Sequence, residues 1–282
     1  MPPPEILYSP YVLAILGLCV GSFLNVVIHR LPLMMERDWR QEAAEILEVA
    51  IAETPTISLA TPRSRCPSCG HPIAWYENIP LASWVWLRGR CSACKAAISA
   101  RYPMIEVTTA TLFALVGWRF GAHPSALLWC GLVATVVALA FIDLDTQYLP
   151  DSLTQPLLWA GIIASALRWI PVTLVDSIAG AVIGYVSLWV VAEAFRIVRG
   201  KIGMAPGDFK LLAALGAWLG WQLIPLIVLL SSAVGATVGI AMIVFRGHDR
   251  EVPIPFGPYL AGGGLASLFL GEQLMRLWMA RA

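Results

Sequence analysis

Carboxylates stand at the ends of two apolar stretches of the sequence. Asp143 and Asp145 follow the stretch 126–142, and Asp208 precedes the stretch 211–245. Acidic side chains beside or inside membrane-like segments are costly, so a function is the first explanation to consider. Two carboxylates that lie close together cannot both ionise easily and can share a proton. One can then activate a water molecule while the other protonates the leaving group, as in an aspartic protease, without a metal or a covalent intermediate.

From chemistry alone, simpler roles for these acids stay open. An acid at a helix end can cap the helix, and the acids of this chain can pair with Lys201 or Lys210. A local ion pair to Arg196, three residues on, is enough to explain Glu193. The same acids could also form the proton relay of a proton-coupled membrane transporter.

Four cysteines have the spacing of a metal site. They form two Cys-x-x-Cys pairs about twenty residues apart, a spacing typical of zinc sites. Four thiolates make a closed tetrahedral shell, which is structural, because a catalytic zinc keeps a position for water. Two disulfides and four unrelated thiols are the alternatives, and His71 could replace one ligand, although a neighbouring surface histidine explains it equally well. The four expected zinc ligands are Cys66, Cys69, Cys91 and Cys94.

The composition indicates a membrane protein. Apolar residues make up 58% of the 282 residues and charged residues only 13%, about half of what a soluble domain carries. The first charge-free stretch, 6–28, is expected to stay in the membrane as an anchor, because no signal-peptide cleavage pattern precedes its basic flank. Cys19 and Cys130 lie inside apolar stretches and are expected to act as small apolar residues.

Eight membrane-spanning helices are expected from the charge-free stretches. Residues 211–245 are uncharged over 35 positions, which would make about 52 Å of helix, too long for one crossing. We therefore expect this stretch to fold back near 220–225. The second span is short and carries Glu106 one turn inside. The expected spans are 6–28, 104–118, 126–142, 152–167, 174–194, two within 211–245, and 258–277.

The loop charges indicate the orientation. If the loops alternate between two sides, 15 of the 19 Lys and Arg side chains fall on one side, and the positive side faces the cytoplasm. The polar region 29–102 is then cytoplasmic, where thiols stay reduced. Apolar residues recur at helical spacing over 35–50, so an amphipathic helix there lies either on the membrane or on its own domain. The expected fold is an all-α polytopic membrane protein with about eight transmembrane helices and a small cytoplasmic zinc-binding domain between the first two.

Motifs along almost the whole chain resemble those of the bacterial type IV prepilin peptidases, which are bifunctional leader peptidases and N-methyltransferases. Besides the two cysteine pairs, the matching segments are 21–32, 77–80, 101–103, 142–145 with 149–151, 207–211 and 253–259. Their order along the chain makes the resemblance stronger than any one motif. It implies a division into a first transmembrane helix (6–28), a cytoplasmic zinc-binding domain (29–102) and a membrane catalytic domain (103–282).

The resemblance assigns the catalytic aspartates to Asp143 and Asp208. Asp145 is two residues from Asp143, so a continuous helix would turn the two about 200° apart, and only one could face Asp208. Asp151 follows Pro150 and could cap the next helix. The family's second motif is usually Gly-x-Gly-Asp, but here Ala205 takes the place of the first glycine. Alanine poorly permits a positive φ or a close backbone approach.

The resemblance also implies substrates, cofactors and a location. The substrates would be prepilins or pseudopilins, whose basic leader is cleaved at the cytoplasmic face of the bacterial inner membrane. S-adenosylmethionine would methylate the new N-terminal amine, and Gly89 falls in the region tied to methylation. Zinc would be structural, membrane lipid would surround the spans, and no nucleic acid is expected. The alternatives from the residues are the proton-coupled transporter and a non-catalytic zinc-ribbon adaptor in the membrane.

Overall fold

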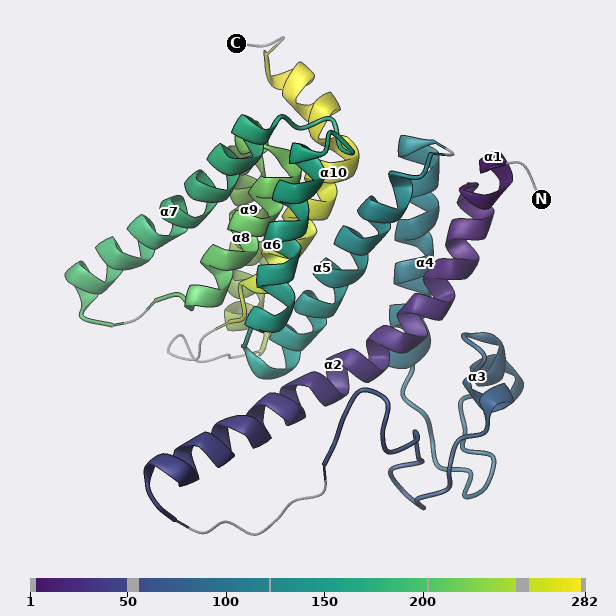
Figure 1. Ribbon diagram of the computed structural model, residues 1–282. Coiled ribbons are helices and arrows are strands. Elements are labelled where there is room, and N and C mark those ends of the chain that lie inside the picture. The colour runs from purple at the N-terminus through teal and green to yellow at the C-terminus, as the bar shows by residue number, and fades with distance from the viewer. Residues whose placement is uncertain (1–3, 50–55, 122, 202, 247–253, 280–282) are drawn as a thin grey trace. The chain divides into compact units, whose positions relative to one another are not determined.

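The computed structural model describes residues 4–49, 56–121, 123–201, 203–246 and 254–279. Within these ranges the chain is helical, and its only strand-like pairings are two isolated bridges, Arg65 with Pro72 and Arg90 with Ala97. The expected all-α fold is therefore confirmed for the described part. The helices shown in Figure 1 are α1 (Pro4–Leu7), α2 (Pro10–Ile46), α3 (Ala82–Trp86), α4 (Arg101–Phe120), α5 (Ala126–Thr146), α6 (Asp151–Ala166), α7 (Leu174–Arg199), α8 (Pro206–Leu219), α9 (Ile224–Arg246) and α10 (Gly257–Met279), with short 3₁₀ turns at Trp75–Asn78 (η1) and Trp221–Leu223 (η2).

Each of the eight expected spans corresponds to one helix, namely α2 and α4 to α10. Four helical segments are long and apolar enough to cross a membrane: Pro10–Ile46, Ala126–Thr146, Leu174–Arg199 and Trp221–Phe245. The chain is thus a multi-pass membrane protein by its helices. By length and composition alone, eight crossings are not shown, because α6 has 16 residues and α8 only 14.

The expected fold-back inside 211–245 is present. Helix α8 ends at Leu219, and its cap, Gly220, has φ +82°. The 3₁₀ turn η2 follows, and α9 begins at Ile224. Glycine suits this turn because it adopts a positive φ without a steric penalty.

The expected amphipathic helix is present over most of its length, but it is continuous with the first span. Helix α2 runs for 37 residues from Pro10 to Ile46, through Pro32, and includes most of the polar segment expected to form its own helix. The segment after Pro32 is rich in Leu, Met, Glu and Arg, which favour helix, so one proline does not end it. Figure 1 shows a bend in the middle of α2, as an internal proline often causes.

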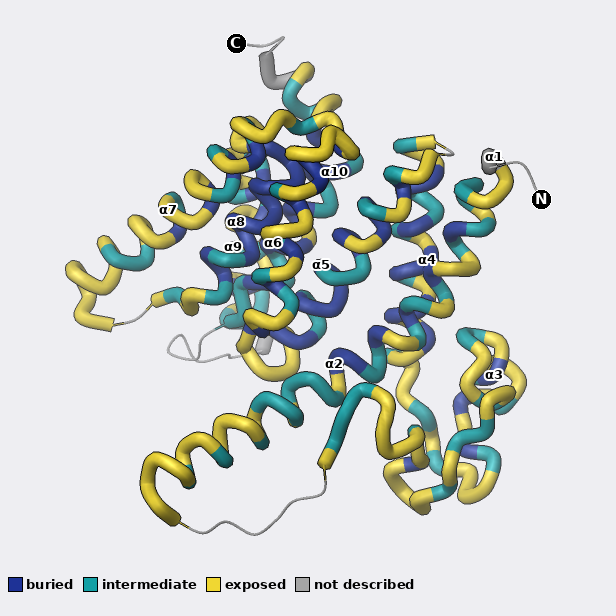
Figure 2. The backbone as a smooth tube through the Cα atoms, viewed as in Figure 1, coloured by how far each residue is buried: buried dark blue, intermediate teal, exposed yellow. Residues whose placement is uncertain are grey.

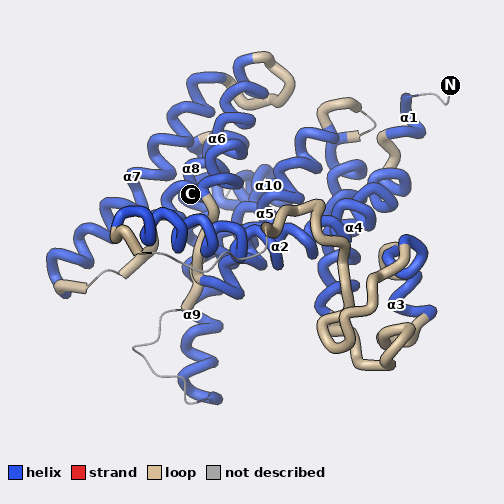
Figure 3. The backbone as a smooth tube through the Cα atoms, turned by 60° about the horizontal axis from the view of Figure 1, so that its bottom comes forward, coloured by secondary structure: helices blue, strands red, loops and turns tan. Residues whose placement is uncertain are grey.

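Two compact units divide the chain, Met1–Ala134 and Thr135–Ala282. In the first, α2 packs on α4 so closely that a Cβ on Gly21 would lie 2.7 Å from the Cα of Glu106. In the second, α8 packs against α6, α7 and α10, and every residue from 211 to 219 is buried. Figure 2 shows α8 as the dark, buried helix of this unit, and Figure 3 shows that the segment with the two cysteine pairs around α3 consists mainly of loops.

Candidate active site and metal centre

Asp143 lies in the last turn of α5 and is 4% exposed. The helix continues through Asp145 to Thr146, so the two acids face different directions, as their spacing indicates. Asp145 is exposed. The structure thus separates the acids of this motif into one that is buried and one that is not.

The N-terminus of α10 holds the Asp143 carboxylate. The backbone N–H of Gly257, the first residue of α10, donates a buried hydrogen bond of 3.0 Å to Asp143 Oδ2. First-turn N–H groups have no partner within the helix and carry partial positive charge, so they favour a carboxylate. A Cβ on Gly257 would lie 2.7 Å from the same oxygen. Only glycine therefore fits at this position without moving the carboxylate.

Asp208 is the third residue of α8 and is 5% exposed. Burial raises the pKa of the Asp208 carboxyl, and the negative charge of Asp143 raises it further. The backbone N–H of Asp208 donates to the Ala205 carbonyl at 3.1 Å, which closes the first turn of the helix. The two buried carboxylates are thus close enough for one charge to act on the other.

The turn before Asp208 accommodates Ala205 without strain. Ala205 is the N-cap residue of α8 with φ −79° and ψ 145°, an extended conformation open to any residue. Pro206 favours this conformation in the residue before it. Gly207, in contrast, needs to be glycine, because a Cβ there would lie 2.8 Å from the Cβ of Leu149. The missing first glycine therefore leaves the backbone intact, and the second lets the two aspartate motifs approach.

The remaining acids of these segments have structural partners. Both oxygens of Asp151 lie 2.7 Å from Lys210 Nζ, in an ion pair that joins the start of α6 to α8. Glu193 pairs with Arg196, whose Nε donates at 2.9 Å. Asp151 and Glu193 thus have the ion-pairing role that the sequence left open for these acids.

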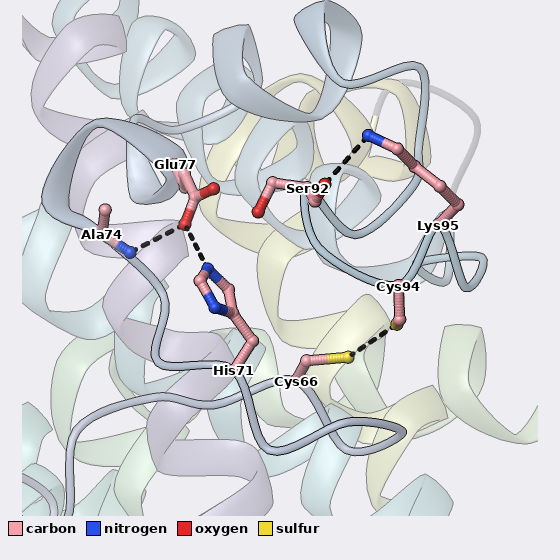
Figure 4. Close-up of polar contacts among 7 residues, drawn as sticks. All are labelled: Cys66, His71, Ala74, Glu77, Ser92, Cys94 and Lys95. Carbon is pink, nitrogen blue, oxygen red and sulfur yellow. Dashed lines mark hydrogen bonds and ion pairs between the residues drawn. The ribbon is translucent and has the colours of Figure 1, made fainter.

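The four cysteines of the two Cys-x-x-Cys pairs come together in the first unit. Their sulfur atoms all lie within 4.8 Å of one another, and those of Cys66 and Cys94, drawn in Figure 4, are 3.8 Å apart. Such a group could hold a metal ion. His71 is not a member, because its Nε2 faces Glu77 Oε2 at 3.8 Å instead (Figure 4).

The two cysteine turns repeat the same backbone pattern. The N–H of Cys66 donates to the His71 carbonyl at 2.9 Å, and that of Cys91 donates to the Ala96 carbonyl at 2.9 Å. Backbone N–H groups also point at the sulfurs. Those of Cys69 and Ser68 lower the pKa of the Cys66 thiol to about 6, and the Cys94 and Ala93 groups lower that of Cys91. The first thiol of each turn therefore favours the thiolate, the form that binds metals, whereas burial and the neighbouring thiols raise the pKa of Cys69 to about 11.

The residue after each pair shows where the turns differ. Gly70 has φ +71° and Lys95 has φ +60°. Their N–H groups donate to the carbonyls of Cys66 at 2.9 Å and Cys91 at 3.1 Å. Lysine rarely adopts a positive φ, and here its Nζ donates to the Ser92 carbonyl at 2.9 Å (Figure 4).

Gly89 has a packing role that its geometry explains. Its φ is +65°, its N–H donates to the Trp84 carbonyl at 2.8 Å, and a Cβ there would lie 3.0 Å from the Trp84 ring. The Trp84 indole donates in turn to the Ile98 carbonyl at 3.3 Å. The glycine therefore lets the indole close over the segment that leads into the second cysteine turn.

Two contacts could not be anticipated from the sequence. The segment 253–259 was noticed only as a matching motif, and nothing indicated that Gly257 holds Asp143. A glycine followed by a proline at a helix start was the available signal. The contact between Glu106 and the N–H of Leu81, 2.7 Å long, was also not anticipated.

A buried aspartate pair at the ends of apolar helices and a four-cysteine cluster are thus the two candidate sites of this helical membrane protein. Residues 15–120 match the Bacterial Peptidase A24 N-terminal domain, and residues 130–240 match the Type IV leader peptidase family. The chain belongs to this family of type IV leader peptidases.

Relatives named prepilin leader peptidase/N-methyltransferase match nearly the whole chain. The Aeromonas hydrophila protein is 50% identical over 265 residues, which cover 93% of this chain and 91% of the relative. The proteins of Stutzerimonas stutzeri (51% over 261 residues, 92% and 90%) and Pseudomonas aeruginosa (51% over 266 residues, 94% and 91%) are similar to the same degree. No solved structure matches the chain.

Proposed function

We propose that this chain is a membrane aspartic endopeptidase that removes the basic leader of type IV prepilins or pseudopilins and N-methylates the new N-terminus. Relatives with this name share half of its residues over more than nine tenths of its length. Neither the proton-coupled transporter nor the zinc-ribbon adaptor is supported by any relative found. The observation that carries the proposal is the buried pair of Asp143 and Asp208.

In this proposal the two aspartates have different roles. Asp143, held by the Gly257 N–H, is the ionised partner and takes a proton from the attacking water. Asp208, whose pKa is raised by burial and by the Asp143 charge, keeps its proton and gives it to the carbonyl oxygen of the scissile peptide bond. When the tetrahedral gem-diol collapses, the C–N bond breaks, the proton on Asp143 passes to the leaving amine, and one hydroxyl group returns its proton to Asp208. No covalent intermediate forms, because water is the nucleophile.

We propose eight crossings, with the active site and residues 29–102 on the cytoplasmic side of the bacterial inner membrane. The helices α2 and α4 to α10 match the eight charge-free stretches one to one, and the uneven Lys and Arg content of the loops supports the orientation. Residues 6–28 are then the first crossing, residues 29–102 the zinc domain and residues 103–282 the catalytic domain. Cleavage on this side suits a substrate whose basic leader stays in the cytoplasm.

We propose that zinc is the metal of the cysteine cluster and that its role is structural. Sulfurs about 2.3 Å from a tetrahedral zinc are about 3.8 Å apart, and the Cys66 and Cys94 sulfurs have this separation, 3.8 Å. Four thiolates fill the coordination shell, so no position is left for a catalytic water.

S-adenosylmethionine is the proposed methyl donor, and the amine freed by cleavage is the acceptor. The name shared by the relatives supports this second activity. Gly89 is placed in the methylation region by the family resemblance, and its packing against Trp84 suggests that it acts by shaping the zinc domain rather than by contacting the cofactor.

The test uses purified full-length protein in liposomes with a prepilin substrate. Mass spectrometry of the pilin should show a shortened chain, and a gain of one methyl group when S-adenosylmethionine is added. A prepilin that stays intact beside folded, metal-loaded protein would refute the peptidase proposal, and proton-driven transport by the same liposomes would then favour the transporter.

A further inference from the structure

Glu106 is a buried acid that neither site uses. It lies one turn into α4, is 7% exposed, and accepts the backbone N–H of Leu81 at 2.7 Å. The Ser22 side chain of α2 forms a second hydrogen bond with it. The carboxylate therefore fastens the start of α3 to the helix pair α2 and α4.

The depth of this contact in the membrane follows from α2. Ser22 lies six residues before the end of the charge-free stretch 6–28, which is about 9 Å inside it at 1.5 Å per residue. The headgroup layer on each side of the hydrocarbon core is about 5–8 Å thick. Leu81 donates its hydrogen bond to Glu106 at the level of Ser22, so it must lie at the boundary between lipid headgroups and hydrocarbon. Helix α3 begins at the next residue.

The exposed surface of α3 suits this level. Trp86 is 76% exposed, Val85 61% and the preceding Ile79 43%, whereas Ser83 is buried against the domain. Figure 2 shows this exposed face of α3 in yellow. Large apolar side chains so exposed are costly in water, while tryptophan is favoured at the membrane interface. Arg88 and Arg90 follow directly and are exposed, where they could meet lipid phosphates.

The charge of the zinc domain favours lipid over the leader peptide as the occupant of this surface. Between residues 56 and 100 the chain has five Lys or Arg side chains and one acid, Glu77. A basic leader would be repelled, whereas the anionic lipids of a membrane surface attract such a domain. We infer that α3 and Ile79 are inserted in the headgroup layer of the cytoplasmic leaflet, so that the zinc domain rests in the membrane surface. The inference depends on the proposed crossing of α2.

Trp86 can report its own environment. Full-length, zinc-loaded protein is placed in vesicles of phosphatidylethanolamine and phosphatidylglycerol with brominated acyl chains, and its fluorescence is compared with that of Trp86→Phe. The difference between the two isolates Trp86. We expect bromolipid to quench most of this difference and aqueous iodide to leave it almost unchanged. Trp218→Phe is the control, because Trp218 is 3% exposed and its contribution should respond little to iodide.

Two results would overturn the inference. Quenching of the Trp86 contribution by iodide but not by bromolipid would put α3 in water. Protection of Trp86 from iodide only after prepilin is added would make the surface a substrate-docking site. Cleavage is measured in the same vesicles, so a failure of the proposed peptidase activity is seen separately from a failure of this inference.

Discussion

The cysteine cluster and the aspartate pair place ionisable side chains in opposite electrostatic surroundings. In the cluster, backbone N–H groups of each turn lower the pKa values of Cys66 and Cys91. At the aspartate pair, burial and a neighbouring like charge raise the pKa of Asp208. The first arrangement produces anions that a metal can bind, and the second retains a proton that a reaction can use. This difference is the one expected between a metal-binding site and an acid–base site.

The sites also differ in how they are assembled. Each half of the cluster is built within a few residues, by hydrogen bonds between neighbours. The aspartate pair needs three helix ends to meet, and glycines permit two of their close approaches, Gly207 against Leu149 and Gly257 against Asp143. The four predictions below test this contrast.

The largest effect is expected from the aspartates. Asp143→Asn or Asp208→Asn should lower the rate of leader cleavage by about 10²–10⁴-fold, the usual value of general acid–base catalysis, because each removes one partner of the proton-sharing pair. Cleavage in liposomes, normalised to folded protein, is the measurement, and metal content should not change. Asp145→Asn is the matched control, since Asp145 is exposed on the same helix, and should stay within a few-fold of wild type.

Asp151→Asn adds a second control, because it breaks only the ion pair with Lys210, worth about 0–1 kcal/mol at an exposed site. An inactive Asp145→Asn beside an active Asp143→Asn would show that the pair has been assigned to the wrong acid.

The second effect concerns the metal. Replacing Cys66, Cys69, Cys91 or Cys94 by Ser should lose the metal and unfold the zinc domain, because binding contributes about 10–16 kcal/mol in small zinc sites. Methylation should fall more than cleavage, since the aspartates lie in the other unit. Metal content and both activities are measured on each variant, with Cys19→Ser as the control because Cys19 is outside the cluster. Native protein without zinc would contradict this prediction.

The sequence predicted the cluster better than the aspartate pair for a physical reason. Cysteine spacing specifies a turn whose hydrogen bonds are local, so four residues could be assigned from spacing alone. The choice of Asp143 over Asp145 needed helical geometry and the family resemblance together, and Gly257 could not be linked to Asp143 because 114 residues separate them. Helix α2 is a different case, because there the local helix preference across Pro32 outweighed the change from apolar to polar sequence.

A smaller, more selective effect is expected at Gly257. The atom nearest to a new Cβ is the end of the Asp143 side chain, which can move at little cost to stability. Gly257→Ala should therefore displace the carboxylate and lower kcat by about 10²-fold, the effect of a misplacement near 1 Å, with KM and methylation of cleaved pilin almost unchanged. Gly262→Ala, in the same helix with nothing within 4 Å of its Cβ, should keep full activity. Equal losses in both variants, or a higher KM without a change in kcat, would rule out a positioning role.

The smallest effects should distinguish the two cysteine turns from each other. Gly70 and Lys95 have nearly the same positive φ, +71° and +60°, but only Lys95 bears the cost of a side chain there, about 1–2 kcal/mol. Gly70→Ala should therefore weaken metal retention by about 1 kcal/mol, since its Cβ meets nothing within 4 Å and the penalty is purely one of backbone conformation.

Lys95→Gly removes the same penalty but loses the hydrogen bond to the Ser92 carbonyl and adds about 0.5–1 kcal/mol of backbone entropy to the unfolded chain. These contributions nearly cancel, so its net effect on metal retention should be small. The effects of both variants are measured as the chelator concentration that removes half of the metal. This concentration changes about tenfold for each 1.4 kcal/mol of metal-binding free energy. Gly121→Ala, also at a positive φ of +74° with free space but outside the cluster, should leave metal retention unchanged. Equal losses from Gly70→Ala and Lys95→Gly would mean that the lysine side chain, rather than backbone conformation, stabilises the second turn.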